Sequence, residues 1–393
     1  MTIRQNLTNI KNRNVYGTRR NDKRICDIME IIHLRKKLIM TGDNIMKIKP
    51  NDVMIRYTGR IDWTDAEKPV WVYPCTSAEM KFTGNTLKIK VSNRNNYWDN
   101  YLGCIIDQSQ RSYLLNKEGI TELDIVVPDN DTNEHCVLFF KRQDACHEVT
   151  ILEYEIGDGE RLLPLKPLSG RRIEVYGDSV SAGEVSEAVD CVGKEDPVHN
   201  GGYSNSWYSY AWITARKLKA QIHDIAQGGI ALMDRIGWFQ EPNQIGMESV
   251  WDKIHYNPTF GPVTQWDFSQ YTPQVVIVAI GQNDNHPYDF MKNDYNGRQA
   301  ETWRDHYMKF LGKLRKTYPD AHIICCTTLL CHDCSWDKAI DEVVDTMNDK
   351  MITHYVYGRN GCGTPGHLRI PEACEMATEL AEYIEGLEIE GWN

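Results

Sequence analysis

The run Val275–Ile280 contains no polar side chain, which restricts the chain to folds that bury both faces of a strand. Runs that are rich in apolar residues but include some polar ones lie at Ile173–Gly177, Ile222–Ala226 and Ile323–Thr328. Helical patterns with a period near 3.6 alternate with these runs, at residues 205–218, 298–316, 336–351 and 371–386. The alternation predicts an α/β domain over residues 166–393, with a parallel sheet covered by helices on both faces.

Upstream, residues 46–165 show short alternating runs that are separated by turn residues, without helical patterns between them. Examples are Leu87–Val91, Asp124–Val127, Cys136–Phe140 and Val149–Tyr154. This spacing predicts an antiparallel β-sandwich. Residues 1–45 form a basic arm with ten Lys or Arg and four Asp or Glu, and we expect one short helix there, over residues 28–38.

Polar residues whose side chains are suited to catalysis follow the apolar runs of the second half. Ser179 follows Gly177 and Asp178, a glycine pair follows Ala226, Asn283 follows the run that ends at Ile280, and His367 precedes the last helix. Ligands of open α/β sheets gather at the carboxyl edge of the strands, where a serine on the turn projects its hydroxyl. We therefore expect these residues to meet at one edge of the sheet.

The order of these blocks resembles the SGNH subgroup of the GDSL esterases. The blocks are Gly177-Asp178-Ser179, Gly228-Gly229-Ile230-Ala231-Leu232, Gly281-Gln282-Asn283-Asp284 and His367. The segment Phe82–Leu87 is similar to the jelly-roll of carbohydrate esterase family 2, acetylesterases in which a jelly-roll precedes the SGNH domain. The resemblance implies a jelly-roll β-sandwich over 46–165, a flavodoxin-like SGNH-hydrolase domain over 166–393, and removal of O-acetyl groups from xylan-type or glucomannan-type polysaccharides or their oligosaccharides.

The resemblance also implies a role for each residue. Ser179 is the expected nucleophile and His367 the base that accepts its proton. The expected oxyanion hole consists of the backbone N–H groups of Ser179 and Gly229 and the side-chain amide of Asn283, with Gly228 as the alternative to Gly229. These groups suffice for acyl transfer, so we expect no metal and no organic cofactor.

One position departs from the SGNH pattern. Most members carry an aspartate three residues before the histidine, where this chain has Thr364. Some members of carbohydrate esterase family 2 instead orient the histidine through a backbone carbonyl. A carbonyl in the 361–365 loop is therefore the preferred partner of His367, and an acid from elsewhere in the fold is the alternative. We expect Asp178 and Asp284 to anchor loops.

Tryptophans indicate where a sugar would bind. Trp238 and Trp251, in the long insertion between the second and third strands, are the predicted substrate-binding platforms, whereas Trp207 and Trp212 are expected to pack in the core. Cys331 and Cys334 have a Cys-x-x-Cys spacing, but no second pair accompanies them. They are interpreted as part of a loop near the carboxyl edge of the sheet and not as a metal or redox site.

Composition excludes several classes of partner. The net charge of −11 and the pI near 5.6 argue against nucleic acid, which requires a basic face. No stretch of 18 apolar residues occurs, so no membrane segment is predicted. Residues 1–45 lack the apolar core of a signal peptide, and the twelve cysteines are expected to be free thiols, so the expected location is cytoplasmic. A homo-oligomer is left open.

Two other functions remain as alternatives. An SGNH lipid esterase or thioesterase would require an extended apolar pocket for the acyl chain. A non-catalytic carbohydrate-binding protein would use the jelly-roll and contain a decayed Ser-His pair.

Overall fold

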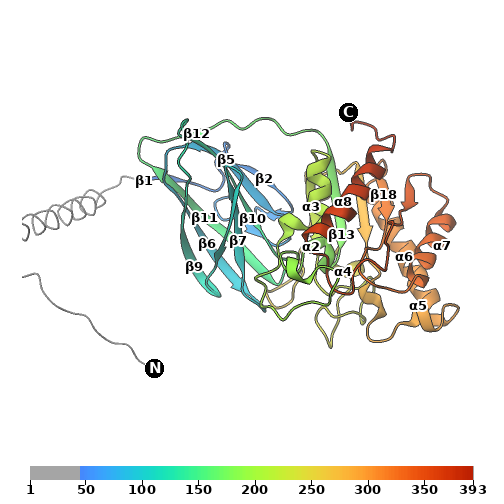
Figure 1. Ribbon diagram of the computed structural model, residues 1–393. Coiled ribbons are helices and arrows are strands. Elements are labelled where there is room, and N and C mark those ends of the chain that lie inside the picture. Colours follow the sequence, from blue (N-terminus) through green and yellow to red (C-terminus); the bar gives the residue numbers. More distant parts are fainter. Residues whose placement is uncertain (1–44, 393) are drawn as a thin grey trace, which may run out of the picture.

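The computed structural model describes residues 45–392, in which two antiparallel sheets precede a parallel sheet with helices (Figure 1). The predicted helix at 28–38 lies outside the described residues. The first antiparallel sheet contains β1 (Ile45–Ile48), β3 (Ile61–Asp62), β4 (Val70–Trp71), β6 (Leu87–Asn95), β9 (Glu118–Ile125) and β11 (His147–Gly157). The second contains β2 (Arg56–Thr58), β5 (Ser77–Thr83), β7 (Tyr101–Ile106), β8 (Ser109–Leu114), β10 (Glu134–Lys141) and β12 (Leu162–Leu163).

The alternating sequence of β6 shows why these strands form a sandwich. Leu87, Ile89 and Val91 are buried, whereas Lys88 and Lys90 between them are partly exposed. Successive side chains of a strand point to opposite faces, so every second residue enters the core between the two sheets. The predicted antiparallel β-sandwich is confirmed.

The second half contains a five-stranded sheet in which all neighbouring strands are parallel. Its strands, in spatial order, are β14 (Gln221–Ala226), β13 (Arg172–Gly177), β17 (Val275–Ala279), β18 (His322–Cys325) and β19 (Ile352–His354). Numbered along the chain, this order is 2-1-3-4-5, which is the flavodoxin-like order. The predicted flavodoxin-like fold is confirmed. The order reverses next to β13, and the crevice at such a switch point is where ligands bind.

Helices cover both faces of the parallel sheet (Figure 1). On β17, Val276 and Val278 pack in the cluster that includes residues of α6 (Arg298–Thr317) and α7 (Ser335–Met347). Val275 and Ile277 face the opposite cluster, which includes residues of α3 (Tyr210–Lys217) and α8 (Ile370–Glu385). The run that has no polar side chain is therefore buried on both sides, as its composition requires.

The remaining elements are short. They are α2 (Ser179–Ala182), α4 (Met247–Val250), α5 (Phe290–Asn293), the two-stranded sheet of β15 (Lys253–His255) and β16 (Thr264–Gln265), and the 3-10 turns η1 (Val189–Cys191), η2 (Ser206–Tyr208), η3 (Phe268–Gln270) and η4 (Asn283–Asn285). None of the helices in residues 45–392 has the length and apolar character that crossing a membrane requires.

A buried arginine joins the sandwich to the α/β half. Arg60, between β2 and β3, donates to the carbonyl of Trp251 (2.6 Å), the hydroxyl of Tyr176 (2.9 Å) and the carboxylate of Glu174 (3.2 Å). Both charged side chains are fully buried. Removing one partner of such a pair leaves an uncompensated buried charge and costs about 3–5 kcal/mol, so the contact between the two halves depends on both side chains. The division of the chain near residue 165 stays a prediction.

Candidate active site

Three of the predicted site residues follow directly on neighbouring strands of the parallel sheet. Ser179 follows β13, the pair Gly228-Gly229 follows β14, and Asn283 follows β17. Parallel strands end at the same edge, so these residues meet at the switch point of the sheet. The loop before α8 brings His367 to the same place.

Ser179 and His367 are in direct hydrogen-bond contact. His367 Nε2 lies 2.7 Å from Ser179 Oγ, and His367 Nδ1 lies 2.5 Å from Asp196 Oδ2. Because a carboxylate only accepts hydrogen bonds, Nδ1 carries the proton and Nε2 of the neutral ring accepts from the serine. The three side chains form a chain of hydrogen bonds from a carboxylate to a hydroxyl, an arrangement typical of an activated serine.

The preferred partner of His367, a carbonyl in the 361–365 loop, is wrong. The carbonyls of Gly361 and Thr364 accept from backbone N–H groups of residues 332 and 331, and that of Gly363 accepts from the side chain of Arg359. Asp196 instead orients the imidazole, and its second oxygen accepts the backbone N–H of His367 (2.9 Å).

The approach of Asp196 depends on the residue before the histidine. A Cβ atom on Gly366 would lie 2.6 Å from Asp196 Oδ1 and 2.7 Å from the carbonyl of Lys194. Only glycine leaves room for the two segments at this distance. Arg369, whose Nη2 lies 2.9 Å from Asp196 Oδ1, adds a positive charge behind the carboxylate.

The charges around His367 favour its protonated form. Burial lowers the pKa of the imidazole, but the carboxylates of Glu184, Asp196 and Asp178 outweigh this effect and raise the pKa to about 9. For Asp196, burial opposes ionisation, yet the hydrogen bond and charge of His367 lower the pKa of the carboxyl. The surroundings therefore stabilise the imidazolium form of His367.

The three residues of the predicted oxyanion hole, Ser179, Gly229 and Asn283, line the same cavity. Ser179 is the first residue of α2, so its backbone N–H lies outside the hydrogen-bond ladder of the helix. Within residues 45–392, the Gly229 N–H has no acceptor in range, whereas the Gly228 N–H donates to Asp144 Oδ2 (2.6 Å). Of the two glycines, Gly229 is thus the one with a free donor. The Asn283 amide donates to the Ile230 carbonyl (3.1 Å) and to the carboxylate of residue 178 (3.2 Å).

Two aspartates next to the site residues anchor loops, as expected. Asp178 caps α2 by accepting from the backbone N–H of Val180 (2.9 Å). Asp284 accepts from the backbone N–H of Leu232 (3.0 Å) and from the indole of Trp303 (2.7 Å). Burial raises the pKa of Asp178 to about 6 and that of Asp284 to about 7. Neither carboxylate contacts His367 directly.

A cavity of about 620 Å³ opens above the serine. Its walls come from both halves of the chain, and one wall is the segment 96–98 between β6 and β7 of the sandwich. About half of the lining is polar, and it includes Asn96, Asp178, Ser179, Glu184, Gln240, Glu241, Gln282, Asn283, Asn285 and His367. The sandwich therefore shapes the space around the hydroxyl.

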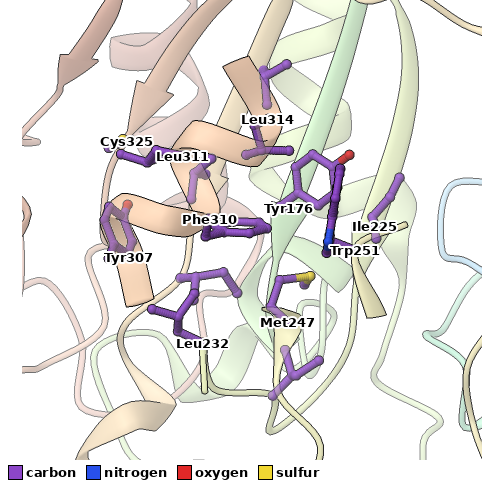
Figure 2. Close-up of a cluster of buried hydrophobic side chains, with 14 of the residues drawn as sticks. Tyr176, Ile225, Leu232, Met247, Trp251, Tyr307, Phe310, Leu311, Leu314 and Cys325 are labelled. Carbon is purple, nitrogen blue, oxygen red and sulfur yellow. The ribbon is translucent and has the colours of Figure 1, made fainter. Parts of the chain in front are cut away.

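The two predicted tryptophan platforms have different environments. Trp238 is 54% exposed and lines the cavity, with His286 stacked on its indole. Trp251 is only 8% exposed and packs in the core beside Tyr176 and Phe310, as Figure 2 shows. The prediction for Trp251 is wrong because aromatic contacts enclose its ring and Arg60 holds its carbonyl, so no face is open to a ligand.

Sequence reasoning missed three residues of this region. Asp196 lies in an irregular segment without a recognisable pattern. Glu184 lines the cavity shortly after Ser179, and this proximity to the Gly-Asp-Ser turn was the available signal. Asp144 reaches across from the sandwich to Gly228, a contact that only the assembled fold creates.

The Cys-x-x-Cys segment lies near the site without forming a metal centre. Cys331 lines the cavity, and both Cys331 and Cys334 are exposed. In the part of the chain that the structure describes, no group of three His, Cys, Asp or Glu side chains is arranged to hold a metal ion.

Comparisons with known proteins agree with this architecture. The profile of the carbohydrate esterase 2 N-terminal family matches residues 57–165. The chain is 28% identical over 341 residues to cellulase/esterase CelE of Acetivibrio thermocellus, which covers 84% of this chain and 39% of CelE. The chain thus spans well under half of CelE. It is 28% identical over 278 residues to the acetylxylan esterase / glucomannan deacetylase of Cellvibrio japonicus, covering 70% of this chain and 72% of that protein.

Solved structures show the same two-part arrangement. A family two carbohydrate esterase from Clostridium thermocellum, in complex with cellohexaose, superposes with a TM-score of 0.71 at 25% identity, covering 86% of this chain and 100% of that chain. A family two carbohydrate esterase from Cellvibrio japonicus superposes with a TM-score of 0.72 at 23% identity, covering 88% and 98%. The profile match, the two relatives and the shared fold make this chain similar to carbohydrate esterase family 2 of the SGNH hydrolases, in agreement with the resemblance that its sequence motifs indicate.

Proposed function

We propose that this protein is a serine esterase that removes O-acetyl groups from xylan-type or glucomannan-type polysaccharides or their oligosaccharides. The observation that carries the proposal is the contact of 2.7 Å between Ser179 Oγ and His367 Nε2, backed by Asp196 and open to a cavity. A serine hydroxyl is a weak nucleophile until an adjacent base accepts its proton, and this geometry supplies that base.

In the first step, Ser179 Oγ attacks the acyl carbon of the acetyl ester while His367 Nε2 accepts the serine proton. The carbonyl double bond opens to a tetrahedral oxyanion, and the imidazole becomes an imidazolium. Asp196 holds the ring through Nδ1 and stabilises the positive charge that has formed. The other carboxylates near the ring add to this stabilisation.

Hydrogen-bond donors stabilise the negative oxygen. The backbone N–H groups of Ser179 and Gly229 and the amide of Asn283 form the proposed oxyanion hole. The Asn283 amide would exchange its bond to the Ile230 carbonyl for one to the oxyanion. This exchange is favourable because hydrogen bonds to a charged acceptor are about twice as strong as those between neutral groups.

The leaving sugar oxygen departs with the proton of His367, which leaves an acetyl group on Ser179. Water then attacks the acetyl carbon while His367 accepts a proton from it, and acetate leaves as the serine hydroxyl is restored. No step requires a further reactant beyond the ester and water.

The chemistry of the cavity supports a sugar more than a lipid. An acyl-chain pocket would be predominantly apolar, whereas eight of the nineteen residues that line this cavity carry a carboxyl or amide group. Trp238 offers an exposed aromatic surface at the rim, on which a sugar ring can stack. The names of two relatives, a glucomannan deacetylase and an esterase bound to cellohexaose, agree with this choice.

The test measures acetate release from acetylated xylo-oligosaccharides and acetylated glucomannan oligosaccharides. The same enzyme is assayed on p-nitrophenyl acetate and p-nitrophenyl octanoate, with Ser179→Ala as the control. We expect hydrolysis of the acetylated sugars and preference for acetyl over octanoyl esters. Preference for octanoyl esters would instead support a lipid esterase, and binding without any hydrolysis would support a carbohydrate-binding protein.

A further inference from the structure

A second carboxyl group lies in the cavity beside the Ser179–His367 pair. Glu184 follows α2, and its backbone N–H donates to the carbonyl of Ser179 (3.0 Å), so it moves with the turn that carries the serine. Its side chain lines the same cavity and is 15% exposed. The mechanism proposed above gives Glu184 no direct contact with the reacting groups.

The carboxylate faces two imidazoles without contacting either closely. Glu184 Oε2 lies 4.0 Å from His367 Nε2, and Oε1 lies 4.0 Å from His199 Nε2. Within residues 45–392, neither oxygen has a hydrogen-bond partner. Each separation of 4.0 Å is too long for a direct hydrogen bond, but it leaves room for a bound hydroxyl that contacts both the carboxylate and the imidazole.

The surroundings make room for Glu184 and orient its neighbour. A Cβ atom on Gly228 would lie 2.8 Å from Asp144 Oδ2 and 3.1 Å from Glu184 Oε2, so a side chain at that position would displace these carboxylates. The backbone N–H of Gly201 donates to His199 Nδ1 (3.1 Å), so in the neutral ring Nε2 carries the proton and presents it to the glutamate side of the cavity. An acceptor and a donor thus face the same space.

The protonation of Glu184 is consistent with binding a hydroxyl. Burial, opposed by the charge of His367 and reinforced by the neighbouring carboxylates of Asp144, Asp196 and Asp178, raises the pKa of Glu184 to about 7. Near neutral pH the group therefore exists in both forms, and either form offers an oxygen that accepts a hydrogen bond.

We propose that Glu184, together with His199, binds the free hydroxyl of the sugar carbon next to the acetylated one. This inference rests on the proposed function. The leaving oxygen must lie beside His367 Nε2 to receive its proton, and Glu184 Oε2 is 4.0 Å from that nitrogen. A hydroxyl on the adjacent ring carbon is therefore within reach of Glu184, which makes this residue a determinant of which acetyl esters are cleaved.

The experiment compares Glu184→Gln with the wild type on two esters. One is a xylo-oligosaccharide that carries a single acetyl group next to a free hydroxyl, and the other is p-nitrophenyl acetate, which has no such hydroxyl. Each kcat/KM is taken at the plateau of its own pH profile, so that a changed pKa of His367 does not enter. The control is Glu187→Gln, whose carboxyl bonds Arg142 and Asn205.

For Glu184→Gln, kcat/KM on the sugar ester should fall about 10- to 100-fold further than kcat/KM on p-nitrophenyl acetate, as expected for the loss of a hydrogen bond to a charged group. Any loss that both esters share reports the charge that Glu184 contributes beside His367. The control should match the wild type on both esters. An equal loss on both esters, or no loss on the sugar ester, would overturn the inference.

A binding measurement separates this inference from the proposed function. Titration calorimetry of xylohexaose with Ser179→Ala, with and without Glu184→Gln, needs no hydrolysis. We expect the affinity to fall about tenfold when Glu184 is replaced, and an unchanged affinity would overturn the inference. A wild type that hydrolyses neither ester would contradict the proposed function, while the titration would still decide the role of Glu184.

Discussion

Two of the Asp–His pairs in the α/β half of the molecule differ at the second nitrogen of the imidazole. In one, His367 bonds Asp196 (2.5 Å) and faces Ser179 Oγ (2.7 Å). In the other, His332 Nε2 bonds Asp337 (3.0 Å), and its Nδ1 donates to the Leu330 carbonyl (2.7 Å). Both nitrogens of that second ring are bound to protein acceptors, so it has no position for a reacting proton.

The electrostatics of the two pairs are alike. Burial lowers the pKa of each histidine, but the neighbouring carboxylates outweigh it, and both pKa values lie above the ordinary value. In each pair the aspartate has a lowered pKa. A perturbed pKa therefore does not distinguish an active pair from a structural one. The two pairs are distinguished by the atom that faces the imidazole nitrogen not bonded to the aspartate. Of the two histidines, His367 is the one that has a hydroxyl and a cavity there.

Replacing each histidine gives the largest expected difference. His367→Ala removes the proposed base and should lower kcat by about 10⁶-fold, as in other serine hydrolases. His332→Ala should leave kcat within a few-fold of the wild type and lower the melting temperature, because Asp337 loses its partner. Acetate release and thermal unfolding of both variants check this. Comparable loss of kcat in the two variants would contradict the distinction.

Replacing each aspartate sharpens the comparison. Asp196→Asn keeps the shape of the side chain but cannot stabilise the imidazolium, and we expect kcat to fall by up to about 10⁴-fold. Asp337→Asn should instead reduce the free energy of unfolding by about 1–3 kcal/mol with kcat unchanged. Steady-state kinetics and urea titration separate the two effects. Full activity in Asp196→Asn would return the orienting role to another group.

Replacing a residue of the proposed oxyanion hole should lower kcat less than replacing His367 or Asp196. Among the residues that the structure describes, the His332–Asp337 pair has no counterpart to this residue. Asn283→Ala should lower kcat by about 10²- to 10³-fold, with a smaller change in KM, because the amide acts mainly in the transition state. Single-turnover measurements on p-nitrophenyl acetate test this. Nearly full activity would remove Asn283 from the proposed oxyanion hole.

The sequence allowed some of these site residues to be predicted, but not all of them. Ser179, Gly229 and Asn283 were predictable because each follows an apolar strand, and parallel strands end at one edge. Asp196 was not predictable, since it lies 171 residues from His367 in an irregular segment whose position depends on loop packing. Periodicity also cannot separate a tryptophan in the core from one at a cavity, which explains the error at residue 251.

The dependence on pH tests the charged surroundings of the active pair. His367 must be neutral to accept the serine proton, and the anions facing it, Glu184, Asp196 and Asp178, raise its pKa to about 9, with Arg369 behind Asp196. Below that pKa, kcat/KM should rise about tenfold per pH unit. Asp196→Asn removes one anion, so the rising part of the pH profile of kcat/KM should move to lower pH. A profile that stays in place would contradict the assignment of this rise to His367 beside Asp196.

The smallest expected effect concerns the two tryptophans of the insertion. Trp238→Ala removes an exposed platform and should raise KM for an acetylated oligosaccharide about 3- to 10-fold. Trp251→Ala leaves a cavity in the core and should cost about 3–5 kcal/mol of unfolding free energy, with little direct effect on KM. Kinetics and chemical denaturation of both variants check this. Equal stability loss in the two would contradict their different environments.

Labelling of the nucleophile is the most direct test of the central claim that Ser179 is activated by His367. The wild type, Ser179→Ala and His367→Ala are treated with an alkylphosphonate that reacts with activated serines, and the modified peptide is identified by mass spectrometry. We predict rapid modification of Ser179 in the wild type, slow modification in His367→Ala, and none at this peptide in Ser179→Ala. Modification of a different residue, or equal rates in the wild type and His367→Ala, would contradict the account.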